Sequence, residues 1–394
     1  MKSKIIISII MVICHFSTSV GQSTLNDVLH QIESNNSTLQ AFRQQAEAQK
    51  IANHTGIYLP NPELEFAYLW GSPATTGNRV NFSVVQLFDF PTAYKHKSRI
   101  ADNRDLIAEY EYESRRRELV LEAGTICVEL VYRNALKQEL EKRLQHAQGI
   151  ATAYKERLDR GDADMLEHNK AQLNLLNARK AAEANLIERD ALMLQLQRLN
   201  NGQVITFDDR SYPVYPILSD FEQWYEQAQQ HNPALQATAL ETESSRQQVK
   251  LNRALSLPKF SAGYMNETIA GTILQGPVIG ISIPLWENRN TIRQAKAQTI
   301  AWQNIETDAK MQFYNSLKIQ HAKALALQAL VVDYRRTLEM SNNADLLKKA
   351  LNLGQIPLIN YIMELTINYD AMDNVLQAER DAWLSILELR QWEK

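Results

Sequence analysis

Two long stretches of this sequence contain almost no residue that would end a helix. No proline occurs between Pro91 and Pro213, and neither proline nor glycine occurs between Pro284 and Gly354. Proline lacks a backbone N–H and clashes with the preceding turn, so its absence allows a helix to continue. A helix from about residue 92 to 160 would be on the order of 100 Å long, at 1.5 Å per residue. The chain is therefore expected to be mainly helical, with unusually long helices.

Apolar residues in these stretches recur at alternating intervals of four and three, the spacing of a coiled-coil seam. The first stretch carries one seam before Gly161 and one after it, and the second carries a seam before Gly354. A glycine at the end of a seam is typical of a turn. The residues of the three seams are Leu140, Leu144, Ala147, Ala151, Tyr154 and Leu158; Ala171, Leu175, Ala178 and Ala182; and Leu327, Val331, Tyr334 and Leu338. The pattern predicts two antiparallel coiled-coil hairpins, over about 92–200 and 287–392.

The chain also repeats itself once. Five short matches follow one another in the same order, at offsets between 191 and 198 residues. They include Asn36-Ser37-Thr38-Leu39-Gln40-Ala41 with Asn232-Pro233-Ala234-Leu235-Gln236-Ala237, and Leu59-Pro60 with Leu257-Pro258. We interpret this as duplication of a unit of nearly 200 residues, far longer than a solenoid repeat of about 20–50 residues. The first unit is placed at 22–200 and the second at 220–394, with a linker over 201–219.

Each unit contains two segments that alternate with period two, as a strand with one buried face does. Strands are expected at about 63–70 and 79–89 in the first unit, after a helix over 25–55, and at about 259–267 and 276–285 in the second. One face of the first strand is apolar, with Leu64, Phe66, Tyr68 and Trp70. The opposite faces hold mainly small and polar residues, such as Glu63, Glu65, Asn81, Ser83, Ser261 and Ser282. Each unit is therefore predicted to run helix, strand, strand, helix, helix.

The N-terminus has the pattern of a signal peptide. Lys2 and Lys4 precede an apolar run over 5–14, and Ser19-Val20-Gly21 resembles a signal-peptidase site. The run is shorter than the ~20 residues of a membrane-spanning helix. Residues 1–21 are therefore predicted to direct export, which leaves a periplasmic, secreted or outer-membrane protein. The remaining cysteine, Cys127, is expected to be a buried small hydrophobe.

Composition and motifs exclude several classes of function. A net charge of −3 gives no reason to expect nucleic-acid binding. The sequence contains no HExxH, CxxC, GxSxG, GxGxxG or P-loop pattern, so we expect no enzyme, no cofactor and no metal site. The histidines are dispersed, and His146 and His168, on opposite arms of the first hairpin, are expected to be solvated.

Four strands are too few to close a barrel. A closed barrel needs about eight strands, and an eight-stranded barrel is filled by its own side chains. Twelve strands, contributed by three copies of the chain, would leave a lumen. We therefore expect a homotrimer with a membrane β-barrel whose apolar face contacts outer-membrane lipid. Trp70 and Trp286 lie at strand ends, where membrane-interface aromatics occur. The alternative is an ordinary half-buried sheet on a soluble core, although long coiled helices offer no globular core for it to cover.

The whole mature chain resembles the TolC-like outer-membrane efflux proteins. The residues that carry the resemblance are Leu59-Pro60-Asn61-Pro62-Glu63-Leu64, Arg157-Leu158-Asp159-Arg160-Gly161, Gly280-Ile281-Ser282-Ile283-Pro284-Leu285-Trp286-Glu287-Asn288-Arg289 and Leu351-Asn352-Leu353-Gly354. The resemblance implies a trimeric 12-stranded barrel in the outer membrane of a Gram-negative bacterium, continued by a long α-helical coiled-coil tunnel through the periplasm. It also implies docking onto a periplasmic adaptor and an inner-membrane pump. The modest length and short strand–strand loops are most similar to the heavy-metal or cation efflux branch.

The resemblance also suggests site residues. Some family members carry aspartates six and nine residues beyond the second turn glycine, where this chain has Asn360 and Met363, followed by Glu364. These three are our constriction candidates, against the alternative that they are ordinary positions of a solvated helix. The adaptor-contact candidates are Arg157, Leu158, Gly161, Leu351 and Gly354, although any helical hairpin needs turn residues.

The predicted function is a passive exit duct from the periplasm, through which an inner-membrane pump and its adaptor deliver substrates. The main alternative is that the chain is itself a periplasmic adaptor. An adaptor should have one hairpin flanked by compact β domains, whereas this sequence has two hairpins and four strong strands. An exported enzyme would need a catalytic constellation that the sequence does not offer.

Overall fold

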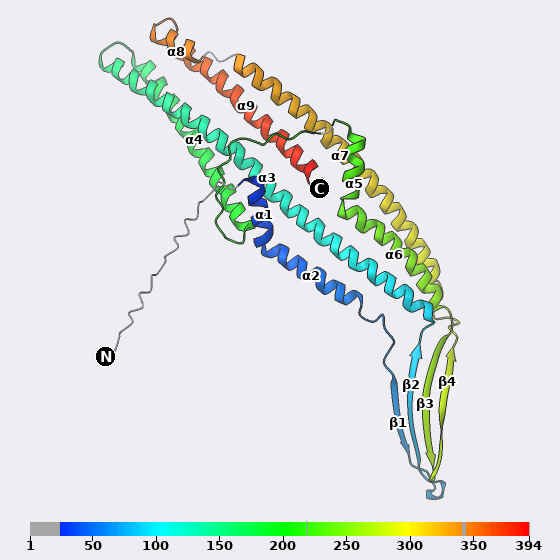
Figure 1. Ribbon diagram of the computed structural model, residues 1–394. Helices are drawn as coiled ribbons and strands as arrows, with labels where there is room; N and C mark the ends of the chain where they lie inside the picture. The colour runs from blue at the N-terminus through cyan, green and yellow to red at the C-terminus, as the bar shows by residue number, and fades with distance from the viewer. Residues whose placement is uncertain (1–23, 218, 341–343, 394) are drawn as a thin grey trace, which may run out of the picture.

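The computed structural model describes residues 24–217, 219–340 and 344–393. The predicted signal peptide, 1–21, lies outside the described residues. The molecule is elongated: long helices run side by side, and a narrow sheet extends from one end of them (Figure 1). Within the described residues, no helix is long and apolar enough to cross a lipid bilayer.

The duplication predicted from the sequence is visible in the order of the elements. The first unit consists of α1 (Leu25–Asn35), α2 (Ser37–Asn53), β1 (Glu63–Leu69), β2 (Arg79–Phe88), α3 (Pro91–Asp159) and α4 (Met165–Leu199). The second consists of α5 (Phe221–Gln230), α6 (Pro233–Leu255), β3 (Lys259–Ile269), β4 (Thr272–Ser282), α7 (Thr291–Met340), α8 (Ala344–Asn352) and α9 (Leu358–Arg390). The predicted fold class, mainly helical with four strands per chain and a repeated helix–strand–strand–helix–helix order, is confirmed.

The prediction of a single helix over 25–55 is wrong, because the chain forms two helices, α1 and α2, on either side of Asn36. The Asn36 side-chain oxygen accepts a hydrogen bond from the Leu39 N–H at 2.8 Å and so caps α2. Its side-chain nitrogen donates to the Leu199 carbonyl at 2.8 Å. Asn232 caps α6 in the same way, accepting from the Ala234 and Leu235 N–H groups. The repeated asparagine of the sequence is therefore a repeated helix cap.

The sheet is antiparallel throughout, with the order β1-β2-β3-β4. The β3–β4 loop consists of only Ala270 and Gly271, both at positive φ (46° and 86°). This two-residue turn makes both strands longer at that end than the predicted 259–267 and 276–285. At its other end β4 stops at Ser282, short of 285, and Pro284, which has no N–H to donate, follows two residues later.

The largest core lies midway along the helices, where α1, α5 and the linker pack against α3, α4, α7 and α9. The linker is well packed, with Ile205 and Phe207 buried and the Tyr212 ring stacked 5.7 Å from the Trp383 ring. Cys127 is buried in this core as a free thiol, as predicted, and burial raises the pKa of the Cys127 thiol to about 12. This core fixes the two hairpins relative to each other.

Candidate functional site

The two hairpin turns have the same backbone closure. Gly161 and Gly354 adopt φ of 76° and 71°, the left-handed conformation that favours glycine. Next to them the Asp162 N–H donates to the Arg157 carbonyl at 2.7 Å, and the Gln355 N–H donates to the Ala350 carbonyl at 2.9 Å. Both glycines of the predicted turns therefore lie at the same kind of hydrogen-bonded helix end.

The adaptor-contact candidates at these turns differ in exposure. Gly161 and Gly354 are exposed, whereas Arg157, Leu158 and Leu351 are half-buried. Arg157 lies 4.9 Å over the Tyr154 ring, and Leu351 packs against a core shared by the two hairpins. The sequence analysis missed exposed apolar side chains beside the turns: Met165 (58%), Leu166 (66%), Leu346 (64%) and Leu353 (73%). These apolar residues do not fall on the 4-3 spacing of the seams, and this departure was the sequence signal that they are exposed.

The constriction candidates Asn360, Met363 and Glu364 lie together on one exposed face of α9. Ile367, Asp370 and Asn374 continue this face at helical spacing, and we name the six residues the α9 stripe. The opposite face of α9 is buried, with Tyr361 and Leu365 packed against α3 and α4. The structure therefore brings the three candidates together on a surface that the other described residues leave uncovered.

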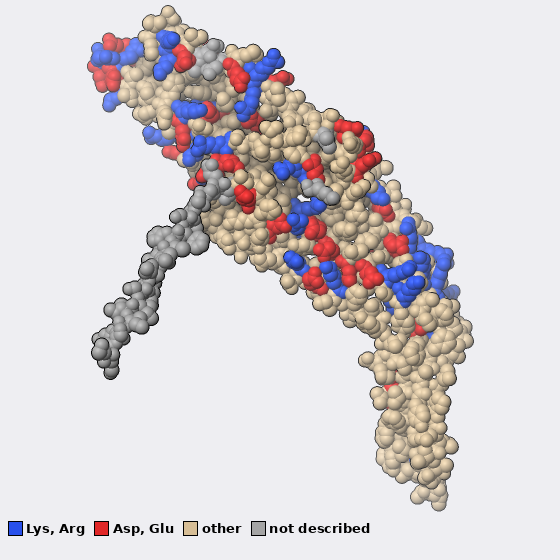
Figure 2. Space-filling model, viewed as in Figure 1, with Lys and Arg blue, Asp and Glu red and all other residues tan. Residues whose placement is uncertain are grey.

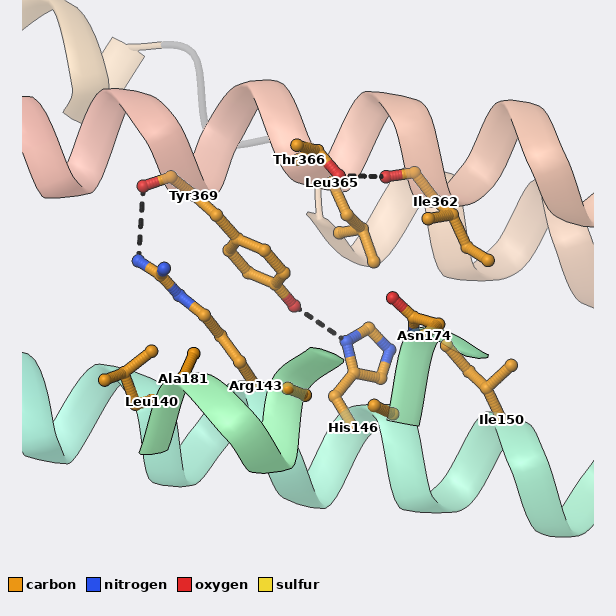
Figure 3. Close-up of a pocket in the computed structure, with 12 residues that line it drawn as sticks. Leu140, Arg143, His146, Ile150, Asn174, Ala181, Ile362, Leu365, Thr366 and Tyr369 are labelled. Atoms are coloured by element: carbon orange, nitrogen blue, oxygen red, sulfur yellow. Dashed lines mark hydrogen bonds between the residues drawn. The ribbon is translucent and has the colours of Figure 1, made fainter. Parts of the chain in front are cut away.

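An ion pair joins α9 to the first hairpin behind the α9 stripe. The Arg143 guanidinium donates to both Asp373 carboxylate oxygens, at 3.0 and 2.6 Å. It also donates to the Tyr369 carbonyl at 3.2 Å (Figure 3). It also lies 4.6 Å from the centre of the Tyr369 ring. The Arg143 side chain is only 10% exposed and Asp373 is 30% exposed, so this pair is largely removed from water.

His146 extends this network, which contradicts the expectation that it is solvated. Its Nδ1 lies 3.1 Å from the Tyr369 hydroxyl (Figure 3). Its Nε2 lies 2.7 Å from the Tyr361 hydroxyl. Burial, and secondarily the charge of Lys348, lowers the pKa of His146 below its ordinary value. Arg143, His146, Asp373 and the two tyrosines thus form one polar network, beside a cavity of about 140 Å³. We call it the inter-hairpin network.

The sheet has one apolar face and one mixed face, as the strand register shows. Leu64, Phe66, Ile279 and Ile281 lie on the apolar face and are 62–85% exposed. The opposite face is mixed along its whole length: Glu63, Glu65 and Ser261 lie toward the helices, and the Arg79–Glu267 ion pair lies beside Leu69 and Leu274 at the far end. The face of the sheet that Figure 2 shows is almost free of charge, in contrast to the helices.

The two predicted interface tryptophans lie at opposite ends of the sheet. Trp70 follows β1 at the end far from the helices and is 81% exposed. Trp286 follows β4 at the helical end and is 79% exposed. No cluster of three or more possible metal ligands occurs among the described side chains.

No protein-family model matches the sequence, and no curated protein gives a significant match. Solved structures do match over nearly the whole chain. CusC, whose crystal structures concern transmembrane channel formation, has a TM-score of 0.77 at 14% identity, covering 94% of this chain and 92% of that one. The CmeC outer membrane channel of Campylobacter jejuni has a TM-score of 0.75 at 14% identity, with coverages of 93% and 85%. The open-state MtrE outer membrane channel of Neisseria gonorrhoeae has a TM-score of 0.72 at 13% identity, with coverages of 94% and 88%.

The chain has the fold of these outer-membrane channels. The likeness is to TolC-like outer-membrane proteins as a group, because identities of 13–14% do not distinguish one branch from another.

Proposed function

We propose that this protein is the outer-membrane channel of a tripartite efflux system. It would provide a passive duct from the periplasm to the exterior, for substrates delivered by an inner-membrane pump and a periplasmic adaptor. The observation that carries the proposal is an exposed four-stranded sheet with an apolar face and two unpaired edges, attached to long helical hairpins. Open edges are not tolerated in lipid, so such a sheet must be completed by other copies.

The strand directions support closure by identical copies. β1 runs away from the helices and β4 runs back toward them, so β4 of one copy meets β1 of the next in antiparallel orientation. Repeating this contact closes a ring of 4n strands. Eight strands leave no lumen, so three copies and 12 strands form the smallest ring with a water-filled pore. We therefore propose a homotrimer.

The sheet surfaces suit an outer-membrane location. The exposed apolar face would contact lipid, and the mixed face would line the pore. Trp70 and Trp286 would mark the two membrane interfaces, where tryptophan is enriched. The predicted signal peptide agrees with export, and the helices would extend into the periplasm.

The α9 stripe would line the narrow periplasmic end of the tunnel. Three copies of Asn360, Met363 and Glu364 would face one another there, with Glu364 and Asp370 supplying negative charge. The hairpin turns, with Arg157, Leu158, Gly161, Leu351 and Gly354, would contact the adaptor. The two-residue β3–β4 loop agrees with the heavy-metal or cation efflux branch, to which we assign the channel as the finer proposal.

A planar-bilayer measurement tests the proposal. The purified mature protein should insert from detergent, show trimeric particles with a central hole by electron microscopy, and conduct ions. Glu364→Gln should reduce the preference for cations, because it removes three carboxylates from the constriction. Glu156→Gln, at an exposed glutamate of α3, is the matched control and should leave selectivity unchanged. A protein that is monomeric and soluble without detergent would instead support the adaptor alternative.

A further inference from the structure

A strongly basic groove lies between α6 and α7, close to the sheet. Arg246, Lys250 and Arg253 project from α6, and Lys296 projects from α7. All four are exposed, and Figure 2 shows blue atoms gathered just above the sheet. We name these four residues the basic groove.

The cations of the basic groove are largely without counter-charges. Only Arg246 has a carboxylate within 4.0 Å, that of Glu243 at 3.5 Å, among the described side chains. Between residues 244 and 305 the sequence has two acids, Glu267 and Glu287. Each already pairs with another cation, at 2.5 Å with Arg79 and at 3.0 Å with Lys259. A concentration of unneutralised charge is unfavourable unless a partner supplies anions.

The groove lies on the same side of the helical wall as α5. The Tyr314 hydroxyl of α7 donates to Glu222 of α5 at 2.7 Å, and Lys318 lies 5.9 Å from the Phe221 ring. Tyr314 follows Lys296 by 18 residues, which is five helical turns, so both point to the same side of α7. Elements added onto one side of a tube wall must lie outside the tube if the pore is to stay open. The basic groove therefore faces outward.

The height of the groove corresponds to that of lipid headgroups. Arg253 lies two residues before the end of α6, and Lys296 lies five residues after the start of α7. At 1.5 Å per residue, Lys250, Arg253 and Lys296 lie within roughly 8 Å of the helix ends that lead to the sheet, whereas Arg246 lies roughly 14 Å from the end of α6. A bilayer adds about 5–8 Å of polar layer on each side of its hydrocarbon core. Exposed Leu285 (69%) and Trp286 (79%) lie between the groove and the sheet, as expected of residues at a lipid interface.

We propose that the basic groove binds the phosphate groups of anionic phospholipids in the periplasmic leaflet. The proposal rests on the proposed function, because it requires the sheet to span the membrane. Lysine and arginine attract anionic headgroups, and exposed Leu285 and Trp286, on the sheet side of the groove, offer an apolar surface for the first methylene groups. An open row of cations over two helices fits several headgroups side by side. Exposed apolar neighbours favour a lipid over an acidic protein segment.

Native mass spectrometry of the assembled protein can measure this binding. The probes are dioleoylphosphatidylglycerol and, as the uncharged reference, dioleoylphosphatidylcholine. The wild type should prefer phosphatidylglycerol. K250Q/R253Q/K296Q should lose about 100-fold in affinity for it at low salt, because each cation near an anionic surface contributes roughly five-fold. K170Q/K323Q/R336Q is the matched control: it removes three exposed cations far from the sheet, and should bind like the wild type.

Four results would overturn the proposal. The triple groove variant could keep its preference for phosphatidylglycerol. It could change the reversal potential in planar bilayers, which would place the cations inside the pore. Inorganic phosphate could displace the lipid more strongly than sodium chloride of equal ionic strength, which would indicate a free-anion site. The variant could lose binding of a polyglutamate peptide while keeping the lipid, which would indicate a protein partner. A wild type that forms no pore would refute the proposed function instead, so the two failures are distinguishable.

Discussion

Replacing Arg143 by methionine should loosen α9 from the first hairpin. Methionine keeps much of the aliphatic stem but removes both hydrogen bonds to Asp373, the bond to the Tyr369 carbonyl and the contact with the Tyr369 ring. The Asp373 carboxylate would then remain without its counter-charge between α3 and α9. The α9 stripe, on the other side of the same helix, would lose the attachment that holds it in place.

The expected magnitude follows from the burial of the pair. Removing one partner of a fully buried ion pair costs about 3–5 kcal/mol. Asp373 is 30% exposed, so water would solvate part of its charge and the cost falls to about 2–3 kcal/mol. If α9 opens locally, this free energy corresponds to an increase of roughly 30- to 150-fold in the exchange rate of its protected amides.

Hydrogen exchange followed by mass spectrometry measures this change over residues 358–376. R198M is the control, since it breaks an ion pair of similar length, 2.8 Å with Glu122, whose side chains are 67% and 50% exposed. It should change exchange by less than about five-fold. The double variant R143M/D373L, which leaves no unpaired charge, should restore much of the protection. Unchanged exchange in R143M would refute the view that the inter-hairpin network holds α9.

Three further predictions concern single side chains. Burial lowers the pKa of His146, so the unfolded state binds a proton on this side chain more readily than the folded state does. The free energy of unfolding should therefore fall as the pH drops below ~6.5. In urea titrations between pH 7 and 5, H146Q should show a smaller fall than the wild type. Burial raises the pKa of the Cys127 thiol to about 12, so maleimide at pH 8 should label it only after denaturation; labelling of the folded protein would contradict its burial. Gly149 lies inside α3 with free space around it, whereas Gly354 has a positive φ. In urea unfolding, G149A should stabilise the protein by about 0.5–1 kcal/mol and G354A should destabilise it by about 1–2 kcal/mol. Equal effects of the two variants would contradict this conformational difference.

The parts of the fold that depend on local patterns could be predicted from the sequence. A seam such as Ala147, Ala151 and Tyr154 needs only helical periodicity to identify its buried face, and all three are buried. Gly161 and Gly354 mark turns because few other residues tolerate their backbone conformation.

The parts that depend on distant partners could not be predicted. His146 is hydrogen-bonded to Tyr361 and Tyr369, which lie 215 and 223 residues later in the sequence. No local pattern distinguishes such a histidine from a solvated one. Leu351 looked like a free turn residue, but it packs into a core that exists only because the two hairpins lie together. The exposure of Met165 and Leu166 likewise depends on what the other hairpin leaves uncovered.

The duplication allows one last prediction, the strand register between copies of the proposed trimer. Leu59-Pro60 and Leu257-Pro258 align β1 with β3 at an offset of 198 residues. The hairpin registers Glu63↔Val85 and Ser261↔Gly280 then make Val85 equivalent to Gly280. Within the chain, Val85 pairs with Gly263, the equivalent of Glu65. If the contact between copies repeats the β2–β3 contact, Gly280 of one copy lies opposite Glu65 of the next.

Cysteine cross-linking tests this register two residues further along the strands, where Val278 should lie opposite Ala67 on the pore-lining face. Directly opposed side chains have Cβ atoms about 4.5–5.5 Å apart, close to disulfide geometry, whereas diagonal neighbours are about 7–8 Å apart. A67C/V278C should therefore oxidise readily to a covalent trimer and to nothing longer, because a closed ring has no free edge. A67C/G280C, displaced by two residues, is the control and should oxidise much more slowly. Equal rates would refute the register, and a ladder beyond three chains would refute the closed ring on which the pore depends.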